Sequence, residues 1–132
     1  MMSLHSSNTT CRVRSRRLGK NGPLVSEVAH GLWVVGGIHW GGADDQTSIS
    51  AIHAALDSGI TLFDTAPVYG FGHSETVLGR ALAGYSGEVY IATKCGLTWN
   101  DRGRIDHDNR PERIRVELDE SLRRLGRDVI DL

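Results

Sequence analysis

The sequence predicts an α/β fold in which parallel strands alternate with helices, and three observations lead to this prediction. Short apolar runs rich in β-branched residues alternate with longer segments whose apolar residues recur at helical spacing. The connections from a helix to the next run are only a few residues long, as in parallel α/β units. Polar residues, Asp64 and Lys94, stand at the ends of two successive runs, where α/β proteins usually place their chemistry.

The beginning of the chain differs in charge from the rest. The first 20 residues contain five basic residues and no acidic one, without the apolar stretch of a signal peptide. We expect residues 1–15 to form a disordered basic leader and residues 16–132 to form the folded domain. Because residues 21–132 carry ten basic and sixteen acidic residues, nucleic-acid binding is not favoured.

The domain is expected to begin with a small β-hairpin. Residues 16–26 contain an Asn-Gly step, at Asn21 and Gly22, between residues suited to strands. Residues 28–32 then predict a first short buried strand. A loop rich in glycine and tryptophan, residues 33–42, follows it.

One helix is predicted before the second strand of the sheet and one after it. Asp44 or Asp45 is expected to cap the first helix, and this helix is expected to end at Ser58 and Gly59. The strand 60–63 follows it with almost no linker. Ser74 is expected to cap the second helix.

The last third of the chain repeats this alternation. A strand is predicted over residues 89–94 and is followed by a polar loop. The third helix is predicted to begin at Pro111 and to end before Gly126. A fourth apolar run covers residues 128–132. The expected buried stripe of the third helix consists of Ile114, Leu118, Leu122 and Leu125.

Four parallel strands joined by three helices are compatible with two architectures. One is an open doubly wound sheet, and the other is part of a (β/α)8 barrel. A barrel needs about 250 residues, so this chain would supply roughly its N-terminal half. Because the sequence ends inside the fourth run, a truncated barrel is favoured. Its open strand edges would make it self-associate or require a complementary half.

The composition argues against several other kinds of site. No apolar run approaches the about 18 residues of a membrane span. The two cysteines, Cys11 and Cys95, form neither a disulfide framework nor a zinc-ligand pattern, which favours a reducing compartment and hence the cytoplasm. The six histidines show no metal-ligand spacing either, so we expect no metal.

A carboxylate, a phenol and an ammonium are expected to meet at the strand ends. Asp64, Tyr69 and Lys94 fall within one strand-helix-strand unit. An ammonium beside a phenol favours the phenolate, which makes the phenol a better proton donor, and a carboxylate would hold the ammonium charged. One reaction that needs such a trio is the donation of a proton to a carbonyl oxygen while hydride adds to its carbon. Each residue alone has a structural explanation, as a cap, a packing group or a solvated charge, but their joint spacing favours a shared site.

Five motifs, in order and spacing, resemble the aldo-keto reductase family from about Leu18 to the last residue. They are Phe63-Asp64-Thr65-Ala66, Val68-Tyr69-Gly70, Ser74-Glu75 with Leu78-Gly79-Arg80-Ala81-Leu82, Ile91-Ala92-Thr93-Lys94, and Ser121-Leu122-Arg123-Arg124-Leu125-Gly126 followed by Asp128-Val129-Ile130-Asp131-Leu132.

The resemblance implies an α/β fold of a definite kind, the N-terminal half of a (β/α)8 TIM barrel with an N-terminal β-hairpin. It implies a cofactor, NADP with NAD not excluded, bound without a Rossmann domain. It also implies that Asp64, Tyr69 and Lys94 are the catalytic residues. The family's catalytic histidine follows the fourth strand, and this sequence ends before it. His39 follows the first strand and is therefore a poor substitute.

Cofactor and pocket residues follow from the same resemblance. Gly31, Leu32 and Trp33 fall where the family often has Gly-Thr-Trp beside the cofactor, so Leu32 removes one hydroxyl. The implied cofactor-binding residues are Gly31, Leu32, Trp33 and Asp64, and the implied substrate pocket consists of Trp33, Trp40 and Tyr69, with Trp99 as a further candidate.

Two functions remain open at this stage. The first is an NAD(P)H-dependent oxidoreductase that reduces small aldehydes and ketones to alcohols, present here as a truncated N-terminal part. The second is a catalytically inactive reductase-like fragment that acts as an interaction or regulatory protein. Binding of NADPH separates the two.

Overall fold

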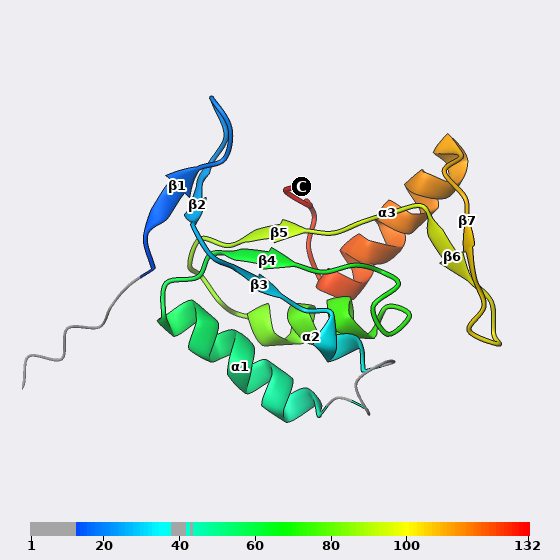
Figure 1. Ribbon diagram of the computed structural model, residues 1–132, viewed down its shortest axis with the longest axis horizontal. Helices are drawn as coiled ribbons and strands as arrows, with labels where there is room; N and C mark the ends of the chain where they lie inside the picture. Colours follow the sequence, from blue (N-terminus) through cyan, green and yellow to red (C-terminus); the bar gives the residue numbers. More distant parts are fainter. Residues whose placement is uncertain (1–12, 38–41, 43) are drawn as a thin grey trace, which may run out of the picture.

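The centre of the molecule is a three-stranded parallel sheet (Figure 1). The structure is a computed structural model that describes residues 13–37, 42 and 44–132. The strands lie in the order β3, β4, β5, with β3 at Ala29–Gly31, β4 at Leu62–Asp64 and β5 at Tyr90–Ala92. Gly31 is opposite Asp64, and Asp64 is opposite Ala92, so the carboxyl ends of all three strands are level.

Helices pack on one face of this sheet. They are α1 (Asp45–Asp57), α2 (His73–Leu82) and α3 (Pro111–Leu125), and α1 and α2 lie below the sheet in Figure 1. Because side chains alternate along a strand, Phe63 and Ile91 point toward the helices and are buried, whereas Asp64 points to the opposite face. The core cluster is Leu32, Val35, Ile52, Ala55, Phe63, Val77, Leu78, Ala81, Leu82, Ile91 and Leu125.

The predicted N-terminal hairpin is present. Strands β1 (Ser15–Arg17) and β2 (Leu24–Ser26) pair antiparallel and are joined by residues 18–23, which contain the Asn-Gly step, although the residue of positive φ in this loop is Gly19. Val13 N donates a hydrogen bond to the carbonyl of Ser58, so a residue before the predicted boundary at residue 16 contacts the rest of the fold. The leader residues 1–12 lie outside the described part.

A second hairpin was not predicted. Strands β6 (Leu97–Trp99) and β7 (Ile105–His107) pair antiparallel where the sequence indicated only a polar loop. The Asn100 side chain closes the turn, because its Oδ1 accepts hydrogen bonds from the backbone N–H groups of Arg102 and Arg104.

Two of the three predicted helix starts are confirmed. Asp44 caps α1 by accepting a hydrogen bond from Thr47 N at 2.7 Å, and Pro111 stands in the first turn of α3. The predicted cap at Ser74 is wrong, since the N-cap of α2 is Gly72. Ser74 is instead fully buried, with its hydroxyl bonded to other elements.

The predicted buried stripe of α3 is only partly right. Leu125 is buried, but Leu118 is 46% exposed, and Glu117 and Ser121 occupy the buried face. Glu117 is retained there because its Oε2 accepts a hydrogen bond from Gly96 N at 2.6 Å. The hydrogen bond to a distant backbone group therefore determines which face of α3 is buried, more than the hydrophobicity of its residues does.

The fourth apolar run lies beside β5 without forming a regular strand. Asp131 N and Leu132 N both donate to the carbonyl of Ile91 at 3.2 Å, and Thr93 N donates to the carbonyl of Leu132 at 3.0 Å. The described sheet therefore has three parallel strands, to which residues 131–132 add the start of the predicted fourth.

Candidate active site

Lys94 and Asp64 form the centre of the site at the carboxyl edge of the sheet. Lys94 Nζ donates to both oxygens of Asp64, at 2.9 and 3.0 Å, and to the carbonyl of Thr65 at 2.8 Å. Burial disfavours the ammonium, but the bonds to Asp64 and the neighbouring phenol of Tyr69 outweigh it, so the pKa of Lys94 is raised above its ordinary value. The ammonium is therefore charged and fixed in direction at neutral pH.

Tyr69 lies next to this pair, as the sequence predicted. Lys94 Nζ is 5.0 Å from the centre of its ring, which is within the range of a cation–π contact. The centre of the Trp33 ring is 6.3 Å from the centre of the Tyr69 ring. The structure thus brings a phenol, an ammonium and a carboxylate into one constellation.

A close approach of two backbones holds the loop that carries Tyr69. The short helix η1 (Val34–Gly36) follows β3, and a Cβ atom added at Gly36 would lie 2.6 Å from the carbonyl carbon of Tyr69. A Cβ added at Gly70 would lie 2.5 Å from the carbonyl oxygen of Gly36. Only glycines allow these two loops to touch, so the contact fixes the backbone of Tyr69.

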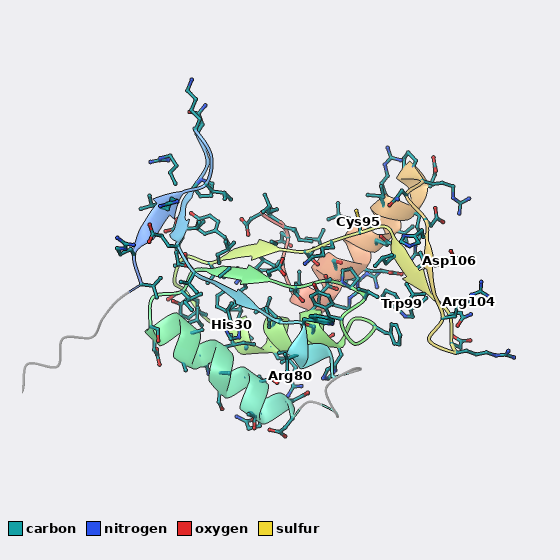
Figure 2. All side chains as sticks on the ribbon, in the orientation of Figure 1. His30, Arg80, Cys95, Trp99, Arg104 and Asp106 are labelled. Atoms are coloured by element: carbon teal, nitrogen blue, oxygen red, sulfur yellow. The ribbon has the colours of Figure 1, made fainter. Side chains whose placement is uncertain are left out.

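A pocket of about 400 Å³ opens beside Tyr69. Trp33 and Tyr69 line it, whereas Trp40 lies outside the described residues, and a role of these residues in binding substrate stays a prediction. Trp99 is not part of the lining; it stacks on Phe71 with ring centres 5.4 Å apart, on the side of the β6–β7 hairpin that faces the rest of the molecule (Figure 2). The lining residues are Trp33, Gly36, Val68, Tyr69, Gly70, Phe71, Leu97, Gly103 and Ile105.

The three residues predicted to lie beside a cofactor differ in accessibility. A Cβ added at Gly31 would meet no atom within 4 Å, and Trp33 is 54% exposed. Leu32 is fully buried, its N–H donates to the carbonyl of Asp64, and its carbonyl accepts from Ser74. Gly31 and Trp33 therefore present surface at the site, while a cofactor contact by Leu32 stays a prediction.

The described histidines lie apart from this site. His30 is on the helix side of the sheet, where its ring is 5.8 Å from that of Phe63 and burial lowers its pKa (Figure 2). His53 bonds to the carbonyl of Ala81, and His73 bonds to Asp45, each at 2.8 Å. Among the described residues, no group of three His, Cys, Asp or Glu side chains is arranged to hold a metal ion.

Comparison with known proteins adds the family. The model of the aldo/keto reductase family matches residues 27–132. The chain belongs to the aldo/keto reductase family.

Relatives within this family match most of the chain. The chain is 47% identical over 117 residues to aldo-keto reductase YhdN of Bacillus subtilis (strain 168), covering 87% of the chain and 35% of the relative. It is 39% identical over 127 residues to the NADH-specific methylglyoxal reductase of Escherichia coli (strain K12), covering 87% and 39%. The chain therefore spans less than half the length of these curated relatives.

A solved structure supports the fold. An aldo-keto reductase from Klebsiella pneumoniae, in complex with NADPH, superposes with a TM-score of 0.67 at 25% identity, covering 90% of the chain and 37% of that structure. Together with the N-terminal hairpin and the parallel sheet, this confirms part of a (β/α)8 barrel over the open-sheet alternative. The described part of the chain has no helix of the length and apolarity that crossing a membrane requires.

Two residues around the candidate site were not predicted from the sequence. Phe71, which has φ of 53° between two glycines of positive φ, forms a wall of the pocket. Its signal was the Gly-Phe-Gly step after Tyr69. Glu75 belongs to one of the motifs that resemble the family, but its burial had no signal in the sequence, because a glutamate in the first turn of a helix usually faces solvent.

Proposed function

We propose that this chain carries the acid–base residues of an NAD(P)H-dependent reductase of aldehydes and ketones. The observation that supports this proposal is the contact of Lys94 with both oxygens of Asp64 beside the ring of Tyr69, which in turn lines a pocket. Membership of a reductase family supports the same reaction class.

Each of the three side chains has a distinct role in this proposal. The hydroxyl of Tyr69 donates a proton to the carbonyl oxygen of the substrate. The Lys94 ammonium stabilises the phenolate that remains, because an adjacent positive charge favours the anion. Asp64 keeps that ammonium charged and directed, through bonds from both of its oxygens.

The described residues fit the nicotinamide end of a cofactor. Open space above Gly31 and the half-exposed ring of Trp33 lie at the carboxyl edge of the sheet, on the same side as Asp64. Gly31 and Trp33 would hold the ring there. When bound, the cofactor supplies the hydride. We propose NADP as the cofactor because one similar structure contains NADPH. NAD is the alternative because one relative is named NADH-specific.

A cofactor titration tests this function against a purely structural or regulatory one. Saturable quenching of tryptophan fluorescence by NADPH, with weaker quenching by NADH, is the expected result. Trp33→Phe should remove most of the signal change, and Trp99→Phe, which alters a ring outside the pocket lining, serves as the matched control. If neither cofactor binds, the reductase proposal for this chain fails and the role of an interaction protein is favoured.

Association is a second proposal, based on the face of the sheet opposite α1 and α2. The side chains of Leu62 and Tyr90 lie on that face and are only partly buried, and β3 pairs only with β4 among the described strands. We propose that the isolated 132-residue chain pairs with a second copy, because two copies supply eight extended segments and bury both open faces. Light scattering after size-exclusion chromatography should give the mass of a dimer, and a cooperatively folded monomer would contradict it.

A further inference from the structure

The first turn of α2 directly follows the loop that carries Tyr69, and it contains a buried carboxylate. Glu75 has no exposed surface, and Ser74 next to it has none either. Both side chains are fully hydrogen-bonded, and their partners belong to other elements of the fold. This turn therefore connects segments that are distant in sequence.

The two oxygens of Glu75 accept hydrogen bonds from two different segments of the chain. Oε1 accepts a hydrogen bond from the hydroxyl of Thr93 at 2.7 Å, and Thr93 immediately precedes Lys94. Oε2 accepts from Arg124 Nε at 2.6 Å. A Cβ added at Gly72 would lie 2.7 Å from Arg124 Cδ, so the arginine packs against the loop that carries Tyr69.

Ser74 extends the same arrangement to the other two strand ends. Its hydroxyl donates to the carbonyl of Leu32 at 3.0 Å, just after β3. It also shares a hydrogen bond of 2.9 Å with Thr65 Oγ1, and the carbonyl of Thr65 is one of the three acceptors of Lys94. The turn thus contacts the chain after β3, β4 and β5 at once.

Stability alone does not account for a carboxylate at this position. Desolvating a charge is costly, and replacing a buried ion pair by apolar side chains of similar volume is often neutral or stabilising. What an apolar residue cannot supply is direction, because it cannot accept hydrogen bonds from Thr93 and Arg124 together. The arrangement therefore favours a role in geometry.

We propose that Glu75 is a positioning residue that holds Lys94, through Thr93, and the Tyr69 loop, through Arg124, in register across the site. It contacts neither substrate nor cofactor. The proposal deepens the proposed reductase function, but its consequence for Lys94 can be measured without turnover.

The chain is well suited to this measurement because its only lysines are Lys20 and Lys94. Labelling with ¹³Cε-lysine gives two NMR signals, which Lys20→Arg assigns. The titration midpoint of Lys94 reports how closely Asp64 and Thr65 surround its ammonium. Asp64→Asn provides the reference, because it removes one carboxylate charge from Lys94 directly.

Three variants separate positioning from an effect of charge and from general loosening of the fold. Glu75→Met removes the acceptors and keeps a similar volume, and it should lower the Lys94 midpoint by at least half of the drop caused by Asp64→Asn. Glu75→Gln removes the charge but can keep both contacts, because its amide oxygen can accept from Arg124 and its amide nitrogen can donate to the hydroxyl oxygen of Thr93, so it should restore most of the midpoint. Val77→Ala, which cuts a core side chain on the same helix, should leave it unchanged despite a loss of stability.

The opposite results overturn the proposal. An unchanged midpoint in Glu75→Met shows that Lys94 does not depend on this carboxylate. A drop in Glu75→Gln as large as in Glu75→Met shows that charge acts instead of position, and a drop in Val77→Ala shows general loosening. If Glu75→Met does not fold, Thr93→Val removes the hydrogen bond between Thr93 and Glu75 from the threonine side and should also lower the Lys94 midpoint.

The outcome is distinguishable from failure of the reductase proposal. If the Lys94 midpoint responds as expected while Tyr69→Phe leaves carbonyl reduction intact, the positioning role stands and the proposed reaction fails. If the midpoint does not respond while Tyr69→Phe abolishes turnover, the reaction stands and Glu75 is only structural.

Discussion

Replacing Asp64 by Asn should separate stability from chemistry at the candidate site. The side chains of Asp64 and Lys94 are 45% and 46% exposed, so water screens the attraction between them. Pairs of this kind contribute less than about 1 kcal/mol, and Asn retains one acceptor for Lys94. We therefore expect Asp64→Asn to lower the free energy of unfolding by less than about 1 kcal/mol at neutral pH.

The pH dependence of this small loss has a definite sign. The pKa of Lys94 is raised above its ordinary value of 10.5 in the folded protein, so the favourable pairing is complete below that value and is lost as the pH rises through the folded pKa. The stability difference between wild type and Asp64→Asn should be constant from about pH 7 to about pH 9 and should shrink at about pH 11.

Urea unfolding followed by circular dichroism measures both quantities, with a carbonyl-reduction assay alongside. We expect activity to fall by at least about 100-fold, because the ammonium is no longer held in place beside the general acid. A loss of more than about 2 kcal/mol would show that the pair is buried and structural. A difference that stays constant at high pH would refute the assignment of the raised pKa to this pair.

Three other predictions concern the surroundings of the site and the helix caps. Gly36→Ala should destabilise the protein by about 1–3 kcal/mol, because its Cβ would meet the next loop at 2.6 Å, while Gly31→Ala, with open space, should not lower thermal stability comparably. The hydrogen bonds from Arg110 lower the pKa of Asp108 from 3.8 to about 2, so the contribution of Asp108 to stability is present above pH 3.8 and is lost as the pH falls toward about 2. Asp108→Asn should therefore weaken the pH dependence of the free energy of unfolding in this range. Asp44→Ala should lower the midpoint of thermal unfolding through loss of the α1 cap, and an unchanged midpoint would contradict that assignment.

The parts of the fold that depend on local patterns could be predicted from the sequence. Phe63 and Ile91 occupy short β-branched or aromatic runs, and their burial between sheet and helices follows from alternation. Asp64 and Lys94 were predicted to meet because parallel strands end at the same edge, and the structure brings them within hydrogen-bonding distance.

The parts that depend on tertiary partners could not be predicted. Ser74 has the sequence signature of a helix cap, but bonds to Leu32 and Thr65 bury it inside α2. Glu117 displaces Leu118 from the buried face of α3 because a backbone N–H of Gly96 needs its carboxylate. Neither partner is adjacent in sequence, so hydrophobic periodicity alone selects the wrong residue.

The second hairpin escaped prediction for a related reason. Its strand β7 consists of exposed residues, Ile105, Asp106 and His107, and shows no pattern of burial. Pairing with β6 and the side-chain bonds of Asn100 form it instead. The hairpin matters for the site because Leu97 and Ile105 line the pocket beside Tyr69.

The measurement that tests the central claim most directly is carbonyl-dependent oxidation of NADPH by wild type, Tyr69→Phe and Tyr85→Phe. Tyr85 lies just beyond α2, outside the pocket lining, and controls for loss of a phenol elsewhere. If Tyr69 is the proton donor that Lys94 and Asp64 support, Tyr69→Phe should lose at least about 100-fold in kcat while Tyr85→Phe retains wild-type turnover. Turnover by Tyr69→Phe within about twofold of wild type would contradict the assignment of this constellation as the catalytic site.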